Sequence, residues 1–125
     1  MEAKSGRNQG KALAVQDVLD RLGGDEELLS EVVELFIEEV PDILSKLKDA
    51  LDSGDWDSAA KLAHTLKGSS SNVGAESFAS LALELEDDSK KKNSARAKET
   101  YHMLQAEFAA VESFVKVPNW IKTSS

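Results

Sequence analysis

The sequence lacks the residues that several common kinds of site require. It contains no cysteine, which excludes disulfides and thiolate-bound metals. No apolar run approaches the roughly 20 residues that a membrane-spanning helix needs. Acidic residues outnumber basic ones by 23 to 15, and the formal net charge is -8. Because nucleic acids and anionic membranes are bound by dense patches of lysine and arginine, we expect neither as a partner.

The two ends of the chain are predicted to lie outside the folded domain. Residues 1–11 are polar, show no periodic face and lack the apolar core of a signal peptide, so we expect a flexible N-terminal tail and a cytoplasmic protein. The 41% hydrophobic content suits one compact core in a chain of this length. We therefore expect a single domain over residues 12–117 and a C-terminal tail over 118–125, unless Trp120 and Ile121 fold back onto the domain.

The apolar residues recur at steps of three and four, and strand-like alternation is absent. Only two prolines and seven glycines interrupt this pattern. The pattern predicts a short helix before Gly23 and four longer helices, which cover about residues 25–53, 55–73, 75–89 and 94–117. Short connections between long amphipathic helices favour antiparallel neighbours. We predict an all-α fold: an antiparallel up-down-up-down four-helix bundle with a short N-terminal cap helix.

The longest predicted helix begins at Asp25, whose carboxylate can cap free amides, and Asp55 can cap the following helix in the same way. Its apolar stripe is predicted at Leu28, Val32, Phe36, Val40, Leu44, Leu47 and Leu51, widened by Leu29, Val33, Ile37 and Ile43. Pro41 lies inside this pattern and removes a backbone donor, so either a kink or a break into two helices is expected there. The stripe continues in phase beyond Pro41, which favours the kink.

The next helix contains a group of residues that a purely structural helix does not need. The apolar side of this helix is formed by Ala59, Ala63, Leu66 and Ser70. His64 lies roughly 130 degrees from the centre of that side and should reach solvent. Lys67 and Gly68 follow at the i+3 and i+4 positions, beside the imidazole. A glycine within a helix costs about 1 kcal/mol relative to alanine, so Gly68 needs a packing or an access reason.

This arrangement is suited to a nucleophilic histidine. A neutral imidazole can attack phosphorus through one ring nitrogen, and the bare flank at Gly68 would admit a partner that carries the phosphoryl donor. Lys67 would balance the charge of the transferred group. As a like charge near the ring, it would also disfavour the imidazolium and so preserve the nucleophilic form of His64.

The same segment resembles a known family, the histidine-containing phosphotransfer (HPt) domains of two-component phosphorelays. The family hallmark is His-x-Leu-Lys-Gly followed by small residues, an aliphatic residue and Gly-Ala. It is matched in register by His64, Leu66, Lys67, Gly68, Ser69, Ser70, Val73, Gly74 and Ala75. Weaker similarity continues through residues 78–86, and the resemblance covers roughly Ala12 to Val115.

The resemblance implies that His64 accepts a phosphoryl group from a receiver-domain aspartate and passes it reversibly to another. It implies that Lys67 stabilises the phosphoryl group, with Lys90 as a weaker candidate for the same work, and that Glu86 orients the imidazole. The partners would be response-regulator receiver domains and, as a further candidate, a hybrid sensor kinase. The Mg²⁺ would belong to the receiver, with no cofactor or metal held by this chain. We expect a monomeric covalent carrier and not an enzyme, since kinase and nucleotide-binding motifs are absent.

Other interpretations of these residues stay open. The chain could be a non-catalytic adaptor that binds receiver domains through the same face, or a four-helix carboxylate metal protein. The metal hypothesis is disfavoured because the many acids of residues 25–42 lie mainly on the polar side of their helix and no Glu-x-x-His pair exists. Glu86 could instead form a solvated ion pair with Lys90. His102 is expected to be an ordinary surface residue, the serines of 69–71 to serve packing, and residues 90–92 to form a solvated turn or part of a docking rim.

Overall fold

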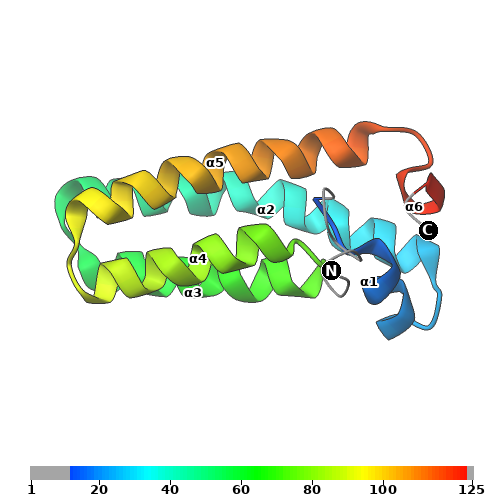
Figure 1. The fold of residues 1–125 in the computed structure, drawn as a ribbon, viewed down its shortest axis with the longest axis horizontal. Helices are drawn as coiled ribbons and strands as arrows, with labels where there is room; N and C mark the ends of the chain where they lie inside the picture. Colours follow the sequence, from blue (N-terminus) through cyan, green and yellow to red (C-terminus); the bar gives the residue numbers. More distant parts are fainter. Residues whose placement is uncertain (1–11, 124–125) are drawn as a thin grey trace, which may run out of the picture.

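The computed structural model describes residues 12–123, in which helices are joined by short turns and no strand occurs. The helices are α1 (Val15–Arg21), α2 (Glu26–Ser53), α3 (Trp56–Asn72), α4 (Glu76–Lys90), α5 (Ser94–Lys116) and α6 (Trp120–Thr123). Figure 1 shows α2 to α5 as four long helices side by side, each antiparallel to the next, with α1 and α6 at one end. The predicted all-α four-helix bundle with a short cap helix is confirmed. The predicted N-terminal tail lies outside the described residues.

Side-chain caps determine where the long helices begin. The Asp25 carboxylate accepts a hydrogen bond from Leu28 N at 3.0 Å at the start of α2, and Asp55 accepts one from Ser58 N at 3.2 Å at the start of α3. Both caps were predicted, since each carboxylate satisfies an amide that the first helical turn leaves free. At the start of α5 the Asn93 side chain accepts a hydrogen bond from Arg96 N at 3.2 Å, a cap that was not predicted.

The buried side of α2 differs from the predicted stripe at its N-terminal end. Leu29 and Val33 are buried, whereas Leu28 is 38% exposed and Val32 is only half-buried. Val32 still packs against the core, but the prediction was wrong for Leu28, because it joined this residue to Phe36 by successive steps of four. Each step of four turns a helix by about 40 degrees beyond a full circle, so the stripe drifted off the core.

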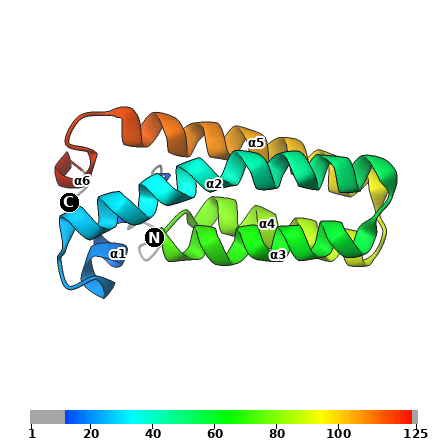
Figure 2. The same cartoon turned by 180° about the vertical axis from the view of Figure 1, so that it is seen from behind.

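Pro41 does not divide α2, so a break into two helices was the wrong alternative. The proline lies on the exposed side of the helix. There the carbonyl that loses its usual backbone partner can reach water. Figure 2 shows α2 changing direction between its N-terminal part, near α1, and its C-terminal half, which runs along α3. The continuous but bent helix agrees with the kink that was preferred.

The core of the bundle combines large side chains from three helices with small ones from α3. The rings of Phe36, Phe78 and Phe108 meet edge to face, with centroids 5.7, 6.1 and 6.4 Å apart. The fully buried residues of α3 are mostly small: Ala59, Ala63, Leu66 and Ser70. Such small residues permit α3 and α4 to pack closely, and this packing determines which side chains meet across the two helices.

A glycine after α3 attaches the cap helix to the bundle. Gly74 has a φ of +76°, and a Cβ built on it would lie 2.7 Å from Val18 Cγ2. Ala14 N donates to Gly74 O at 2.9 Å. Only glycine adopts this conformation freely and leaves room for the close approach of the chain around Ala14.

The C-terminal residues that the structure describes fold back onto the bundle. α5 ends at Lys116, just before Pro118, and the short α6 follows. The Trp120 ring lies 6.0 Å from that of Phe114, and Lys122 Nζ lies 3.3 Å from a Glu26 carboxylate oxygen. Of the two possibilities for this segment, a free tail or a return to the domain, the structure has the second. None of the helices within residues 12–123 is both long and apolar enough to cross a membrane.

Candidate functional site

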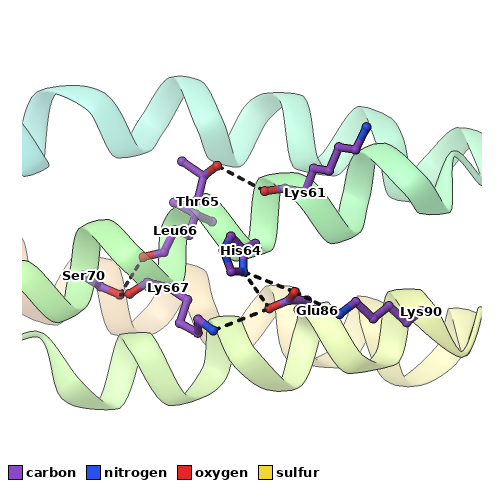
Figure 3. A network of polar contacts seen from close by, with 8 residues as sticks. All are labelled: Lys61, His64, Thr65, Leu66, Lys67, Ser70, Glu86 and Lys90. Atoms are coloured by element: carbon purple, nitrogen blue, oxygen red, sulfur yellow. Dashed lines mark hydrogen bonds and ion pairs between the residues drawn. The ribbon is translucent and has the colours of Figure 1, made fainter.

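The side-by-side packing of α3 and α4 brings His64 and Glu86 together. His64 is on α3, opposite the buried small residues of that helix, and its side chain is 65% exposed. Glu86 is on α4, and only 10% of its side chain is exposed. Figure 3 shows the imidazole standing over the gap between the two helices, with the carboxylate directly below it. The prediction that His64 reaches solvent is therefore confirmed.

Both carboxylate oxygens of Glu86 lie close to one nitrogen of the imidazole. His64 Nδ1 is 3.3 Å from Oε2 and 3.4 Å from Oε1. A carboxylate accepts hydrogen bonds only, so we assign the proton of a neutral His64 to Nδ1. This tautomer leaves the lone pair on Nε2, the ring nitrogen on the far side from Glu86. The ring is thereby oriented with Nε2 away from the carboxylate.

Two lysines approach the same carboxylate. Lys90 Nζ lies 3.2 Å from Glu86 Oε2, and Lys67 Nζ lies 4.0 Å from Oε1. The sequence had left open whether Glu86 orients His64 or pairs with Lys90 one turn later. The structure has both contacts at once, so the carboxylate lies among three nitrogen-bearing side chains (Figure 3).

Opposing effects act on the pKa of the Glu86 carboxyl group. Burial raises the pKa, because the charged form loses water. The hydrogen bonds from Lys90 and His64 lower it, and together with the charges of these groups they outweigh burial, so the pKa is below the usual glutamate value. Glu86 is consequently a carboxylate at neutral pH, and it can accept a hydrogen bond from the Nδ1–H group of His64.

Gly68 has no packing reason within the described part of the chain. A Cβ built on Gly68 would meet no atom within 4 Å. Alanine there would improve helix propensity by about 1 kcal/mol without a clash. Of the two reasons that the sequence allowed, packing and access, the structure removes the first. The bare backbone of Gly68 is exposed and lies one helical turn from His64.

Of the serines after Gly68, Ser70 packs inside the bundle, whereas Ser69 is half-buried and Ser71 is exposed. Ser70 is completely buried, and its Oγ donates to Leu66 O at 2.6 Å, a carbonyl of its own helix. This hydroxyl is unavailable as a nucleophile. The second histidine, His102, is exposed on α5, where its ring lies 6.1 Å from that of Tyr101. Within residues 12–123, no group of three or more His, Cys, Asp or Glu residues is arranged to hold a metal ion.

A comparison with protein-family models shows to which family this chain belongs. The Hpt domain model matches residues 31–114, which run from within α2 into the last turn of α5 and include every residue of the site. The chain belongs to the Hpt domain family. Hpt domains are phosphotransfer carriers in two-component phosphorelays and work with receiver domains and kinases.

A comparison with solved structures agrees with this assignment. The Hpt fold described here is similar to the crystal structure of a histidine-containing phosphotransfer protein from maize, with a TM-score of 0.66 and 27% sequence identity. The similarity covers 87% of this chain and 76% of the maize chain. A search of curated proteins found no match.

Proposed function

We propose that His64 is the phosphoryl acceptor of this Hpt domain. The Nε2 lone pair attacks the phosphorus of an aspartyl phosphate on a receiver domain. The new N–P bond forms as the P–O bond to the aspartate breaks, and the aspartate leaves as a carboxylate. The Nδ1 proton stays on the ring, shared with Glu86. Transfer to a second receiver reverses these steps, with an aspartate oxygen as the nucleophile and Nε2 as the leaving group.

The observation that supports this proposal most strongly is the pair formed by His64 and Glu86. The side chain of His64 is 65% exposed, and its Nδ1 lies 3.3 Å from the carboxylate. As Nε2 bonds to phosphorus, positive charge develops on the ring, because Nδ1 keeps its proton. A fixed carboxylate at Nδ1 stabilises that charge without moving. Glu86 thus both orients the nucleophile and favours its reaction.

Lys67 and Gly68 complete the site on the side of the partner. Lys67 is held only loosely by Glu86, at 4.0 Å, and 34% of its side chain is exposed. Its ammonium can turn toward a phosphoryl group on Nε2 and offset the negative charge. Gly68 leaves open space beside the ring, so a receiver active site can reach it.

The proposal assigns the remaining parts of the reaction to the partners. The Mg²⁺ that such transfer requires would be held by the receiver domain, and this chain would act without a cofactor of its own. The carrier would act as a monomer in the cytoplasm, with response-regulator receivers as partners and a hybrid sensor kinase as a further candidate.

Incubation with a phosphorylated receiver domain and Mg²⁺ tests the proposal. The wild-type chain should acquire a label that is labile in acid and stable in alkali, as a phosphohistidine is, and His64→Gln should acquire none. His102→Gln is the matched control and should be labelled like the wild type. A chain that binds the receiver equally well with and without His64, and never becomes labelled, would instead be the adaptor.

A further inference from the structure

The two lysines at the site contact Glu86 differently. Lys90 Nζ lies 3.2 Å from Oε2, the same oxygen that lies 3.3 Å from His64 Nδ1. Lys67 Nζ approaches the other oxygen, Oε1, at the longer distance of 4.0 Å. In Figure 3 they reach the carboxylate from opposite sides. Both oxygens lie close to His64 Nδ1, at 3.3 and 3.4 Å, so the lysines differ in distance: Lys90 forms the close ion pair with the carboxylate that holds the ring, and Lys67 forms the weaker one.

A carboxylate at this position creates a difficulty for a phosphoryl acceptor. Glu86 has only 10% of its side chain exposed, so water screens its charge poorly. A phosphoryl group on the same imidazole would bring about two further negative charges within reach of that field. An amide side chain at residue 86 could also accept a hydrogen bond from Nδ1–H, and because it is neutral it would not repel the phosphoryl group. The carboxylate is therefore useful only if its negative charge is offset by a cation that stays in place.

We propose that Lys90 is a positioning residue, which neutralises Glu86 and holds its carboxylate on His64 Nδ1 while the phosphoryl group is on Nε2. The inference rests on the proposed function of His64. Lys67 is then released to the phosphoryl group, and Lys90 stays with Glu86. In the phosphorylated site, the two ammonium groups and the protonated ring together balance the carboxylate and the phosphoryl dianion. Without Lys90, this balance is lost and the carboxylate repels the group that the site must accept.

The proposal differs from the two other roles that Lys90 could have. If Lys90 contacts the phosphoryl group directly, its removal should be equally harmful whether residue 86 is charged or not. If Lys90 belongs to a docking rim, its removal should be harmful only with a protein donor. A positioning role through Glu86 predicts that the effect depends on the carboxylate and appears with any donor.

A double-mutant cycle with a small phosphoryl donor separates these roles. Wild type, Lys90→Met, Glu86→Gln and the double variant are incubated with phosphoramidate, from which Nε2 takes the phosphoryl group as the P–N bond breaks and ammonia leaves. Lys90→Met should lower the rate constant of His64 phosphorylation at least about five-fold in the wild-type background, and less than about two-fold in the Glu86→Gln background. Lys90→Arg should restore most of the rate, because it restores the cation.

The controls make each outcome informative. Lys91→Met removes a neighbouring exposed lysine that has no ion pair with Glu86, and it should leave the rate unchanged. All variants should unfold at similar temperatures, because the Lys90 side chain is 63% exposed and such pairs contribute little to stability. Equal losses in both backgrounds, no loss in either, or a loss confined to receiver donors would each overturn the proposal. A wild-type chain that no donor labels at His64 would contradict the proposed function itself.

Discussion

The carboxylate of Glu86 is almost buried between two helices, yet it lies 3.3 Å from the Nδ1 of His64, whose side chain is 65% exposed. The buried group is fixed and the exposed group is accessible. One interaction therefore combines a rigid orientation with an accessible ring, as the proposed exchange of phosphoryl groups with receiver domains requires.

The effect of replacing Glu86 on the transfer rate should depend on whether the new side chain can still accept a hydrogen bond from His64 Nδ1. Glu86→Ala removes the acceptor and should slow phosphorylation of His64 about ten-fold, equal to about 1.4 kcal/mol of transition-state stabilisation. Glu86→Gln keeps an oxygen acceptor and should lose less. Rates from a labelled receiver measure both. If Glu86→Ala transfers at the wild-type rate, the orienting role of Glu86 is wrong.

The lowered pKa of Glu86 predicts a pH dependence of stability. A carboxyl group whose pKa is lower in the folded protein stabilises the fold above its unfolded pKa, and this contribution is lost as the pH falls through the folded value. The loss should therefore occur below about pH 4.5, the ordinary value for this group. Urea unfolding at several pH values should show that the wild type's advantage over Glu86→Gln shrinks in that range. An advantage that grows as the pH falls would reverse the direction of the pKa shift.

Gly68 and Gly74 should respond in opposite ways to alanine. Gly68→Ala adds a Cβ into open space and should stabilise the protein by about 0.5–1 kcal/mol. Gly74→Ala forces a φ of +76° on a residue with a side chain and brings its Cβ to 2.7 Å from Val18, so it should destabilise by about 1–3 kcal/mol. Denaturant unfolding measures both. Changes of the same sign would show that the surroundings of one glycine are misplaced.

A larger side chain at residue 68 should separate stability from function. Gly68→Gln improves helix propensity, so the fold should remain at least as stable as the wild type. The longer side chain should occupy the space beside His64 and reduce transfer from a receiver domain about ten-fold or more. Receiver titrations and transfer rates provide the measurement. An unimpaired variant would remove the access role of Gly68.

Lys67 is predicted to act on the phosphoryl group and not on the fold. Lys67→Ala should slow transfer or shorten the lifetime of the phosphohistidine about five-fold, with unchanged helical circular dichroism. The ion pair of its ammonium with Glu86, at 4.0 Å, is too long to matter much for folding. Loss of helical structure in this variant would mean that Lys67 is a structural residue.

The sequence predicted the features that depend on local rules. The caps at Asp25 and Asp55 and the exposure of His64 follow from short-range patterns and helical geometry, and the structure agrees. The outward turn of Leu28 was missed, because steps of four drift off the core over several turns. The return of Trp120 to the bundle was left open, since it depends on packing against Phe114 rather than on any local signal.

Local sequence rules could not predict the contact between Glu86 and His64, which only the resemblance to HPt domains had suggested. The i, i+4 spacing of Glu86 and Lys90 predicts an ion pair on one helix. The contact of Glu86 with His64 depends instead on how closely α3 and α4 pack. Only the three-dimensional structure shows that both contacts form on one nearly buried carboxylate.

The most direct test of the central claim is to identify the phosphorylated atom. After transfer from a receiver, ¹⁵N and ³¹P NMR of the labelled chain should place the phosphoryl group on Nε2 of His64, with the proton on Nδ1. A phosphoryl group on Nδ1, where Glu86 lies 3.3 Å away, or on any residue other than His64, would contradict the account.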